Sequence, residues 1–207
     1  MGGKGALRQA ALARAAADVL LAEGFDAVTH RAVAARAGLP LGATTYYFAS
    51  RDDLLASAVA LAAQDWLQAC RARLDAGPAA GSVGSPEQVA DVVLDVVSGG
   101  YGREQLRVLY QRHLESAHQP PLRPAVVALD EQAQALVAEV LLRAGLPADP
   151  ATSRLVLATA DGLLVGALAR GEAEPQRHGR EPLAQLLGLL AGDGTGLAAR
   201  RPARAAE

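Results

Sequence analysis

Residues 24–54 contain the pattern that most restricts the fold of this chain, two short helical segments separated by a tight glycine turn. Thr29 is a good N-cap for the first segment, and Gly38 can adopt the left-handed conformation that ends a helix. Pro40 then prevents the first helix from continuing. The second segment, at about residues 41–48, is too short and too rich in Thr and Tyr to be a stable helix alone. The pattern predicts a helix-turn-helix whose second helix is held by its neighbours with one face outward.

The rest of the chain is expected to be helical as well. Hydrophobic residues make up 51% of the 207 residues but aromatic residues only 3%, and no segment of any length has strand periodicity. Capping residues, glycines and prolines place the expected helices at about residues 6–23, 30–37, 41–48, 50–76, 86–98, 103–118, 124–145, 150–171 and 182–191. A polar loop is expected before Pro182 and a flexible tail at residues 192–207. The sequence therefore predicts an all-α protein of about nine helices.

Charge is unevenly distributed along the chain. The whole chain has a net charge of −2, but residues 1–51 carry six Lys or Arg and three Asp or Glu, a net charge of +3. The remaining residues have a net charge of −5. The basic end is the end that contains the predicted helix-turn-helix, as contact with a phosphate backbone requires. Lys4 and Arg8, with Arg14 further along, make a basic N-terminus that either follows this backbone or is a solvated arm.

Several separate features occur in the order found in one family. The first expected helix ends in Ala-Glu-Gly-Phe, Ala37-Gly38 makes the turn, Tyr46-Tyr47-Phe48 ends the second short helix, and Ser50-Arg51-Asp52-Asp53-Leu54 begins the next. Over about the first 55 residues the chain resembles the DNA-binding domain of the TetR family of transcriptional regulators. Many members have Tyr at the position of Thr45 and His at the position of Tyr47. The resemblance therefore does not say which side chain contacts a base and which a phosphate.

The resemblance implies a set of DNA-binding residues. Thr29, His30 and Arg31 lie at a helix start, where backbone N–H groups favour phosphate; the alternative is a cap with two solvated side chains. Arg51 matches a basic position that clamps a phosphate, or is an exposed Arg without a role. The positions expected to enter the major groove are Leu41, Gly42, Ala43, Thr45, Tyr46 and Tyr47. Thr44, Phe48 and Val33 are expected to face inward.

The same resemblance implies a small-molecule effector site in the C-terminal body. His113 lies on the apolar face of the helix expected at residues 103–118, with Leu106, Leu109, Tyr110 and Ala117. Asp161 lies among leucines, so these two ionisable groups either pair, contact a ligand or have structural roles. The candidate effector-binding residues are Trp66, Tyr101, Tyr110, His113 and Asp161, and the aromatic ones fit a protein core equally well.

The last two expected helices are apolar enough to form a twofold dimer interface. Small residues form a stripe on the helix at 150–171, Ala158, Gly162, Gly166 and Ala169, opposite the larger Leu157, Leu164 and Leu168. The helix at 182–191 adds Leu183, Leu186, Leu187 and Leu190. A homodimer would hold two reading helices about 34–36 Å apart, which matches successive major grooves of a palindrome. The alternative is that both helices only fill the core of a monomer.

Other classes of function have little support in the sequence. The four histidines are scattered, Cys70 is the single cysteine, and no phosphate-binding loop or catalytic triad signature is present, so no metal, cofactor or enzymatic activity is expected. No export signal or membrane span is expected, and a cytoplasmic location is compatible with the cysteine content.

These expectations combine into one hypothesis. Residues 1–49 are a helix-turn-helix domain, residues 50–191 an effector-binding and dimerisation domain, and residues 192–207 a tail. The protein is expected to be a homodimeric repressor that an unknown small molecule releases from a palindromic operator. The alternatives are a DNA-binding regulator without an effector and a helical enzyme.

Overall fold

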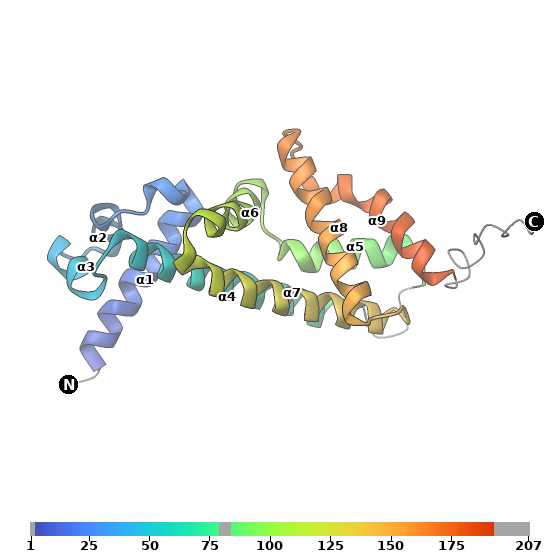
Figure 1. Cartoon of the computed structure of the whole chain (residues 1–207), viewed down its shortest axis with the longest axis horizontal. Coiled ribbons are helices and arrows are strands. Elements are labelled where there is room, and N and C mark those ends of the chain that lie inside the picture. The colour runs from blue at the N-terminus through green and yellow to red at the C-terminus, as the bar shows by residue number, and fades with distance from the viewer. Residues whose placement is uncertain (1–2, 79–83, 193–207) are drawn as a thin grey trace, which may run out of the picture. The chain divides into compact units, whose positions relative to one another are not determined.

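The structure, a computed structural model, describes residues 3–78 and 84–192. Within these ranges the chain forms α-helices and two short 3-10 helices (η), and no strand (Figure 1). In order they are α1 (Gly3–Glu23), η1 (Phe25–Ala27), α2 (His30–Ala37), α3 (Leu41–Tyr47), α4 (Arg51–Ala76), α5 (Pro86–Ser98), α6 (Arg103–His118), η2 (Pro120–Leu122), α7 (Arg123–Arg143), α8 (Pro150–Ala169) and α9 (Pro175–Ala191). The predicted all-α class is confirmed. The tail predicted at residues 192–207 lies, from residue 193 on, outside the described residues.

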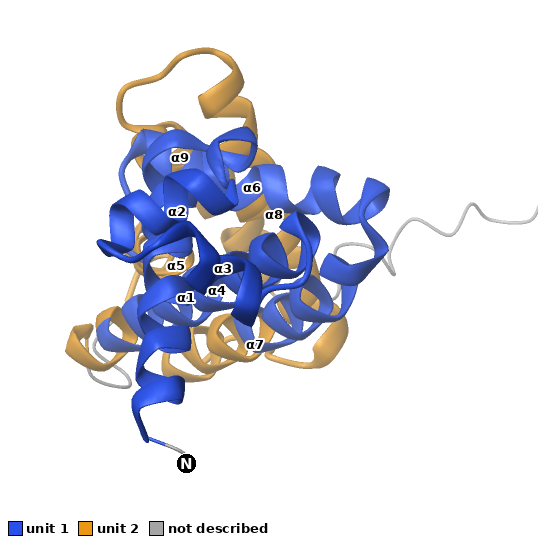
Figure 2. Ribbon diagram, turned by 90° about the vertical axis from the view of Figure 1, so that its left-hand side faces the viewer, with its two compact units in different colours: residues 1–72, 98–133 blue, residues 73–97, 134–207 orange. Residues whose placement is uncertain are grey.

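The chain divides into two compact units (Figure 2). The first contains residues 1–72 and 98–133, and the second contains residues 73–97 and 134–207. Helices α4 and α7 each begin in the first unit and end in the second. These units are defined by contacts, and the domain boundary at residues 49 and 50 stays a prediction.

The local signals of the helix-turn-helix act as expected. The Thr29 side chain accepts a hydrogen bond from the Ala32 backbone N–H at 3.2 Å and caps α2. Gly38 ends α2 at φ 64°, in the left-handed region that favours glycine. Ser50 and Asp53 cap the start of α4 reciprocally, because the Ser50 backbone N–H donates to Asp53 and the Asp53 backbone N–H donates to Ser50 Oγ.

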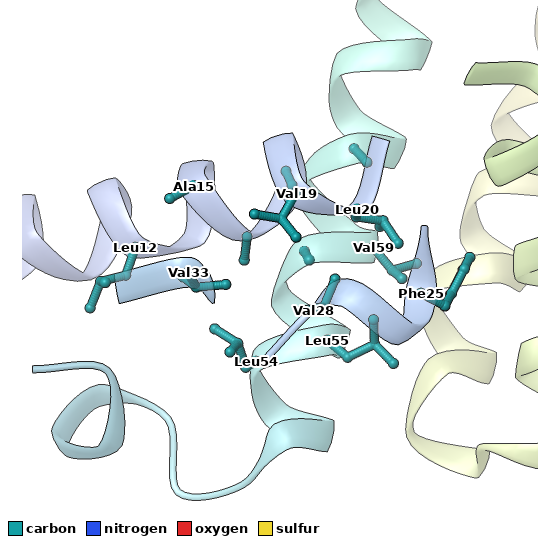
Figure 3. Close-up of a cluster of buried hydrophobic side chains, with 14 of the residues drawn as sticks. Leu12, Ala15, Val19, Leu20, Phe25, Val28, Val33, Leu54, Leu55 and Val59 are labelled. Carbon is teal, nitrogen blue, oxygen red and sulfur yellow. The ribbon is translucent and has the colours of Figure 1, made fainter. Parts of the chain in front are cut away.

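A buried hydrophobic cluster holds the helix-turn-helix together (Figure 3). Leu12 and Leu20 of α1, Val33 of α2 and Leu54 of α4 are at most 2% exposed and belong to this cluster. The same cluster includes Val108 of α6 and Leu122 of η2, together with Phe25, Val28 and Phe48. Helix α3 is therefore fixed on a scaffold that α1, α2, α4 and α6 build jointly.

The cap of α2 gives a testable contribution to stability. Replacing Thr29 by Ala leaves the Ala32 N–H without its side-chain acceptor, so we expect unfolding free energy to fall by about 1 kcal/mol in urea denaturation. Thr29→Ser keeps an acceptor oxygen and is the matched control, with a change of at most a few tenths of a kcal/mol. Equal losses in both variants would show that the methyl group of Thr29, rather than its hydroxyl, matters for stability.

In the second unit α8 packs against α9, and one expectation about α9 is wrong. The sequence placed a polar loop before Pro182 and began the helix there, but α9 begins at Pro175 and contains Pro182. Pro175 occupies the first turn, where its missing N–H costs nothing, so a second proline was mistaken for the start. Buried Gly179 explains why the polar segment is ordered, since a Cβ there would lie 3.1 Å from Leu94 of α5.

Helix α8 has one buried and one exposed face. Val156, Ala160, Leu164 and Ala167 are buried, whereas an exposed stripe runs along the other side through Leu155, Ala158, Gly162, Val165 and Ala169. Within the described part of the chain, α8 is the helix that is long and apolar enough to cross a membrane by length and composition alone. The core helix of a soluble protein meets the same criterion.

Candidate nucleic-acid interface

Helix α3 presents polar and small residues on its exposed face. Thr45 and Tyr46 are exposed, and Tyr46 retains 81% of its accessible surface. Thr44 is completely buried and its hydroxyl donates to the Leu41 carbonyl at 2.7 Å. Leu41 and Gly42 are also exposed, while Ala43 is half-buried. The inward orientation expected of Thr44, Phe48 and Val33 is confirmed, since all three are buried.

The two tyrosines at the end of α3 differ in their surroundings. Their rings meet edge to face, with centroids 4.9 Å apart and an interplanar angle of 89°. Tyr47 is half-buried, and its hydroxyl lies beside Gly5 of α1, 3.6 Å from where a Cβ on that glycine would be. Tyr46 therefore has the freer side chain for contact with a base edge, and Tyr47 connects α3 to α1.

The start of α2 is a second surface of the same motif. Thr29 and Arg31 are exposed, and His30 between them is half-buried. The Nδ1 atom of His30 is buried and has no hydrogen-bond partner in the described part of the protein. The first N–H groups of a helix lack partners within the helix and carry partial positive charge. This end of α2 thus has the donors and the charge that phosphate binding needs.

Several arginines of the basic N-terminal segment are engaged within the protein. Arg14 of α1 forms a bidentate ion pair with Asp65 of α4, and this hydrogen bond raises the pKa of Arg14 above its usual value. Arg36 pairs with Glu23 at 2.9 Å. Lys4, Arg8 and Arg31 are exposed, so the positive charge available to a phosphate backbone is concentrated at the starts of α1 and α2.

Arg51 was expected to clamp a phosphate, and the structure gives its guanidinium other partners. Its Nε donates to the Val28 carbonyl at 3.0 Å and its Nη2 to the Phe25 carbonyl at 2.8 Å. The side chain is half-buried at the first residue of α4. Nothing in the sequence indicated these acceptors, because they lie 23 and 26 residues away in the chain.

Three candidate effector residues lie in one neighbourhood of the first unit. Trp66 of α4 is 3% exposed and lies under the guanidinium of Arg112, which is 5.5 Å from the ring centroid. His113 contacts Asp130 at 3.2 Å and stacks on Tyr110, with ring centroids 6.3 Å apart. Both side chains are half-buried on α6, as their place on its apolar face predicted, whereas Ala117 of the same predicted face is exposed.

The other two candidates have different surroundings. Tyr101 lies in the turn before α6, where burial, with a smaller contribution from Asp65, raises the pKa of its phenol. Asp161 is half-buried on α8 and belongs to the second unit. An effector-binding role for any of the five remains a prediction.

Arg112 was not among the residues predicted from the sequence; it is 5% exposed on α6 and lies 3.8 Å from Asp130. It borders a cavity of about 20 Å³ whose other lining residues are apolar. These come from α1, η1, α4 and α6: Leu20, Leu21, Phe25, Val59, Ala62, Ala63, Val108 and Leu109. The cavity has room for about one water molecule. A signal existed in the sequence, since Arg112 follows Leu106 and Leu109 at helical spacing.

Two family models match the chain. Residues 12–58 match the model described as bacterial regulatory proteins, tetR family. Residues 84–193, more than half of the chain, match the model described as tetracyclin repressor-like, C-terminal domain. No curated protein sequence matches the chain.

Solved structures give the same result. The crystal structure of EbrR, a multidrug binding protein complexed with proflavin, is 29% identical, with a TM-score of 0.66 over 86% of this chain and 99% of that chain. EbrR structures with ethidium and with malachite green also match. SCO1917 from Streptomyces coelicolor A3, a TetR family member, is 28% identical, with a TM-score of 0.62 over 87% of this chain and 98% of that chain. The chain belongs to the TetR family of transcriptional regulators.

Proposed function

We propose that this TetR-family regulator binds a palindromic operator as a homodimer and that a small-molecule effector releases it. The observation that carries the DNA-binding part is the arrangement of α3, in which Thr44 and Phe48 are locked inside while Thr45 and Tyr46 are exposed. A hydroxyl and a phenol can donate to or accept from base edges and phosphates in the major groove. The start of α2 supports this face with phosphate contacts from Thr29, His30 and Arg31.

The proposed dimer uses the exposed stripe of α8 with α9. Of the four small residues expected on the stripe, Ala158, Gly162 and Ala169 are exposed and Gly166 is half-buried. On α9, Leu183 and Leu187 are buried, Leu186 and Leu190 are half-buried, and Leu189 is 76% exposed. Apolar surface of this kind at helical spacing fits a self-complementary contact between two copies.

The proposed effector is a small molecule, and relatives support this part. EbrR, a multidrug binding protein, is complexed with proflavin, with ethidium and with malachite green. Release requires that the effector favour a DNA-incompetent state, and a preference of about 1–3 kcal/mol would change operator affinity by roughly 5- to 150-fold. We further propose that the protein acts in the cytoplasm, where operator DNA is, and that it has no enzymatic activity.

Selection from random DNA tests the proposed function directly. The purified protein should enrich a palindromic sequence from a randomised duplex pool, and fluorescence anisotropy should then give a steep linear fall of log affinity with log salt. Proflavin or ethidium, titrated into the complex, tests release, with a titration of the same duplex without protein as the control because both dyes intercalate into DNA. Enrichment of no sequence would refute operator recognition, whereas enrichment with an affinity that no tested compound changes would leave the effector-free alternative.

Arg31 provides a specific test of the phosphate contacts. Arg31→Gln removes one exposed charge beside the α2 start, so we expect operator affinity to fall about 5- to 10-fold and the salt slope to fall by about 0.9 per subunit. Arg71→Gln removes an exposed charge from the C-terminal part of α4, far along the helix from Arg51, and is the control with an unchanged slope. An unchanged slope in Arg31→Gln would remove this residue from the interface.

A further inference from the structure

The first residue of α4 is attached to the segment that precedes α2. The Arg51 side chain spans two backbone carbonyls, those of Phe25 and Val28, with donor–acceptor distances of 2.8 and 3.0 Å. Phe25 is the first residue of η1, and Val28 directly follows η1. Because Thr29 follows Val28, the guanidinium holds the last carbonyl before the N-cap of α2.

This segment is fixed on two sides. The side chains of Phe25 and Val28 are 4% and 0% exposed and belong to the buried cluster. Their carbonyl oxygens accept from Arg51, and the Phe25 carbonyl also accepts the Val28 N–H at 3.3 Å. The place of the α2 start relative to α4 therefore depends on one charged side chain in addition to apolar packing.

We infer that Arg51 is a positioning residue, which aligns the phosphate-binding start of α2 with α4, in place of the phosphate clamp that family resemblance implies. This inference rests on the proposed DNA-binding function. The Arg51 guanidinium donates two N–H groups to protein carbonyls. These two N–H groups are therefore already hydrogen-bonded before DNA binds. Arg51 affects DNA binding through Thr29, His30 and Arg31, because it fixes the position of the backbone that leads into these residues.

The geometry explains why the residue is Arg. The planar guanidinium presents donors in a fixed fork, so Nε and Nη2 reach two acceptors at once. A Lys ammonium is a point charge on a flexible stem and cannot reproduce this fork. A phosphate clamp, by contrast, works with either residue, because Lys also binds phosphate. Lysine substitution therefore separates the two roles.

The experiment compares Arg51→Lys and Arg51→Gln with wild type on a duplex selected by the wild-type protein. Anisotropy gives affinity over a range of salt concentrations. We expect both variants to lose affinity about 5- to 20-fold, because without the two hydrogen bonds of Arg51 the α2 start must be ordered when DNA binds. The salt slope should equal that of wild type, because the residues that contact phosphate are all retained. Arg31→Gln, with its reduced slope, is the reference for a lost phosphate contact.

Amide hydrogen exchange adds a readout that does not need DNA. Arg51→Lys should speed exchange at Ala32 and Val33, whose N–H groups bond to the Thr29 side chain and carbonyl. Exchange at Phe48, which bonds to the Thr44 carbonyl, should not change. A uniform increase at all three sites would indicate a merely structural role and overturn the inference.

Two further outcomes would also overturn it. Wild-type affinity in Arg51→Lys combined with a reduced slope in Arg51→Gln would show a phosphate clamp. Wild-type affinity in both variants, with only a lower melting temperature, would show that Arg51 stabilises the fold without positioning α2. If the wild-type protein bound no duplex, the proposed function would fail, while the exchange data would still report on the contact between Arg51 and the α2 start.

Discussion

Replacing Gly162 by Glu is expected to make the protein monomeric and to lower operator affinity by at least about 100-fold. Gly162 lies in the middle of the exposed stripe on α8, between Ala158 and Val165. In the proposed twofold contact the introduced carboxylate of each copy would be buried against the apolar surface of the other copy without a partner. The interface is lost because each carboxylate would have to be desolvated without a compensating partner.

The monomer itself should fold normally. Apart from its chain neighbours and the nearby backbone of α8, no atom of the described residues lies within 4 Å of a Cβ added at Gly162. A glycine inside a helix is also less favourable than Glu by several tenths of a kcal/mol. The loss of DNA affinity then results from the separation of the two copies, because a monomer presents only one recognition helix. Two linked DNA-binding domains bind an operator more tightly than one domain by a factor of about 10² to 10⁴, because the second binding event is intramolecular.

Light scattering coupled to size-exclusion chromatography measures the oligomeric state, and anisotropy measures operator affinity. Ala128→Glu, which adds the same charge at an exposed position of α7, is the control and should remain dimeric. A dimeric Gly162→Glu with wild-type affinity would place the interface elsewhere and contradict the proposed role of the α8 stripe.

Much of the local structure could be predicted because it depends on local rules. The Thr29 cap, the left-handed Gly38 and the reciprocal cap of Ser50 and Asp53 involve residues a few positions apart. Each of these signals pairs residues that lie within a few positions of one another in the sequence. The predicted all-α class and the helices around these signals are confirmed for this reason.

The remaining features depend on tertiary partners. The predicted start of α9 was wrong because Pro175 and Pro182 can each begin a helix. The packing of Gly179 against α5 favours the earlier start. The buried guanidinium of Arg112 lies over the ring of Trp66, which is on a different helix, far earlier in the sequence. Helical spacing places Arg112 on the same face as Leu106 and Leu109, but a charged residue is ordinarily assigned to the surface, so this signal was not recognised.

The candidate DNA-binding face was predictable as a group, but its members were not equivalent. Sequence placed Thr45, Tyr46 and Tyr47 together, and only the structure separates exposed Tyr46 from half-buried Tyr47. The difference comes from α1, because the Tyr47 hydroxyl lies beside Gly5 of that helix. No local rule connects residues that far apart.

Tyr46→Ala is expected to lower operator affinity about 30-fold, which is about 2 kcal/mol for the dimer, or about 1 kcal/mol for each copy. The side chain is 81% exposed, so its removal takes away a groove contact with little loss of buried surface. We therefore expect wild-type stability in urea denaturation and a reduced discrimination between the selected operator and a scrambled duplex, both measured by anisotropy in the same buffer.

Tyr47→Ala provides the contrast that makes this prediction specific. It removes a half-buried ring that lies against Tyr46 and Gly5, so it should lower the free energy of unfolding by about 1–2 kcal/mol in addition to weakening DNA binding. Tyr47→Phe keeps the ring and should retain most of the stability. If Tyr46→Ala bound the operator and the scrambled duplex as wild type does, the base contacts would have to come from other residues of α3, because no exposed tyrosine would then be reading the groove.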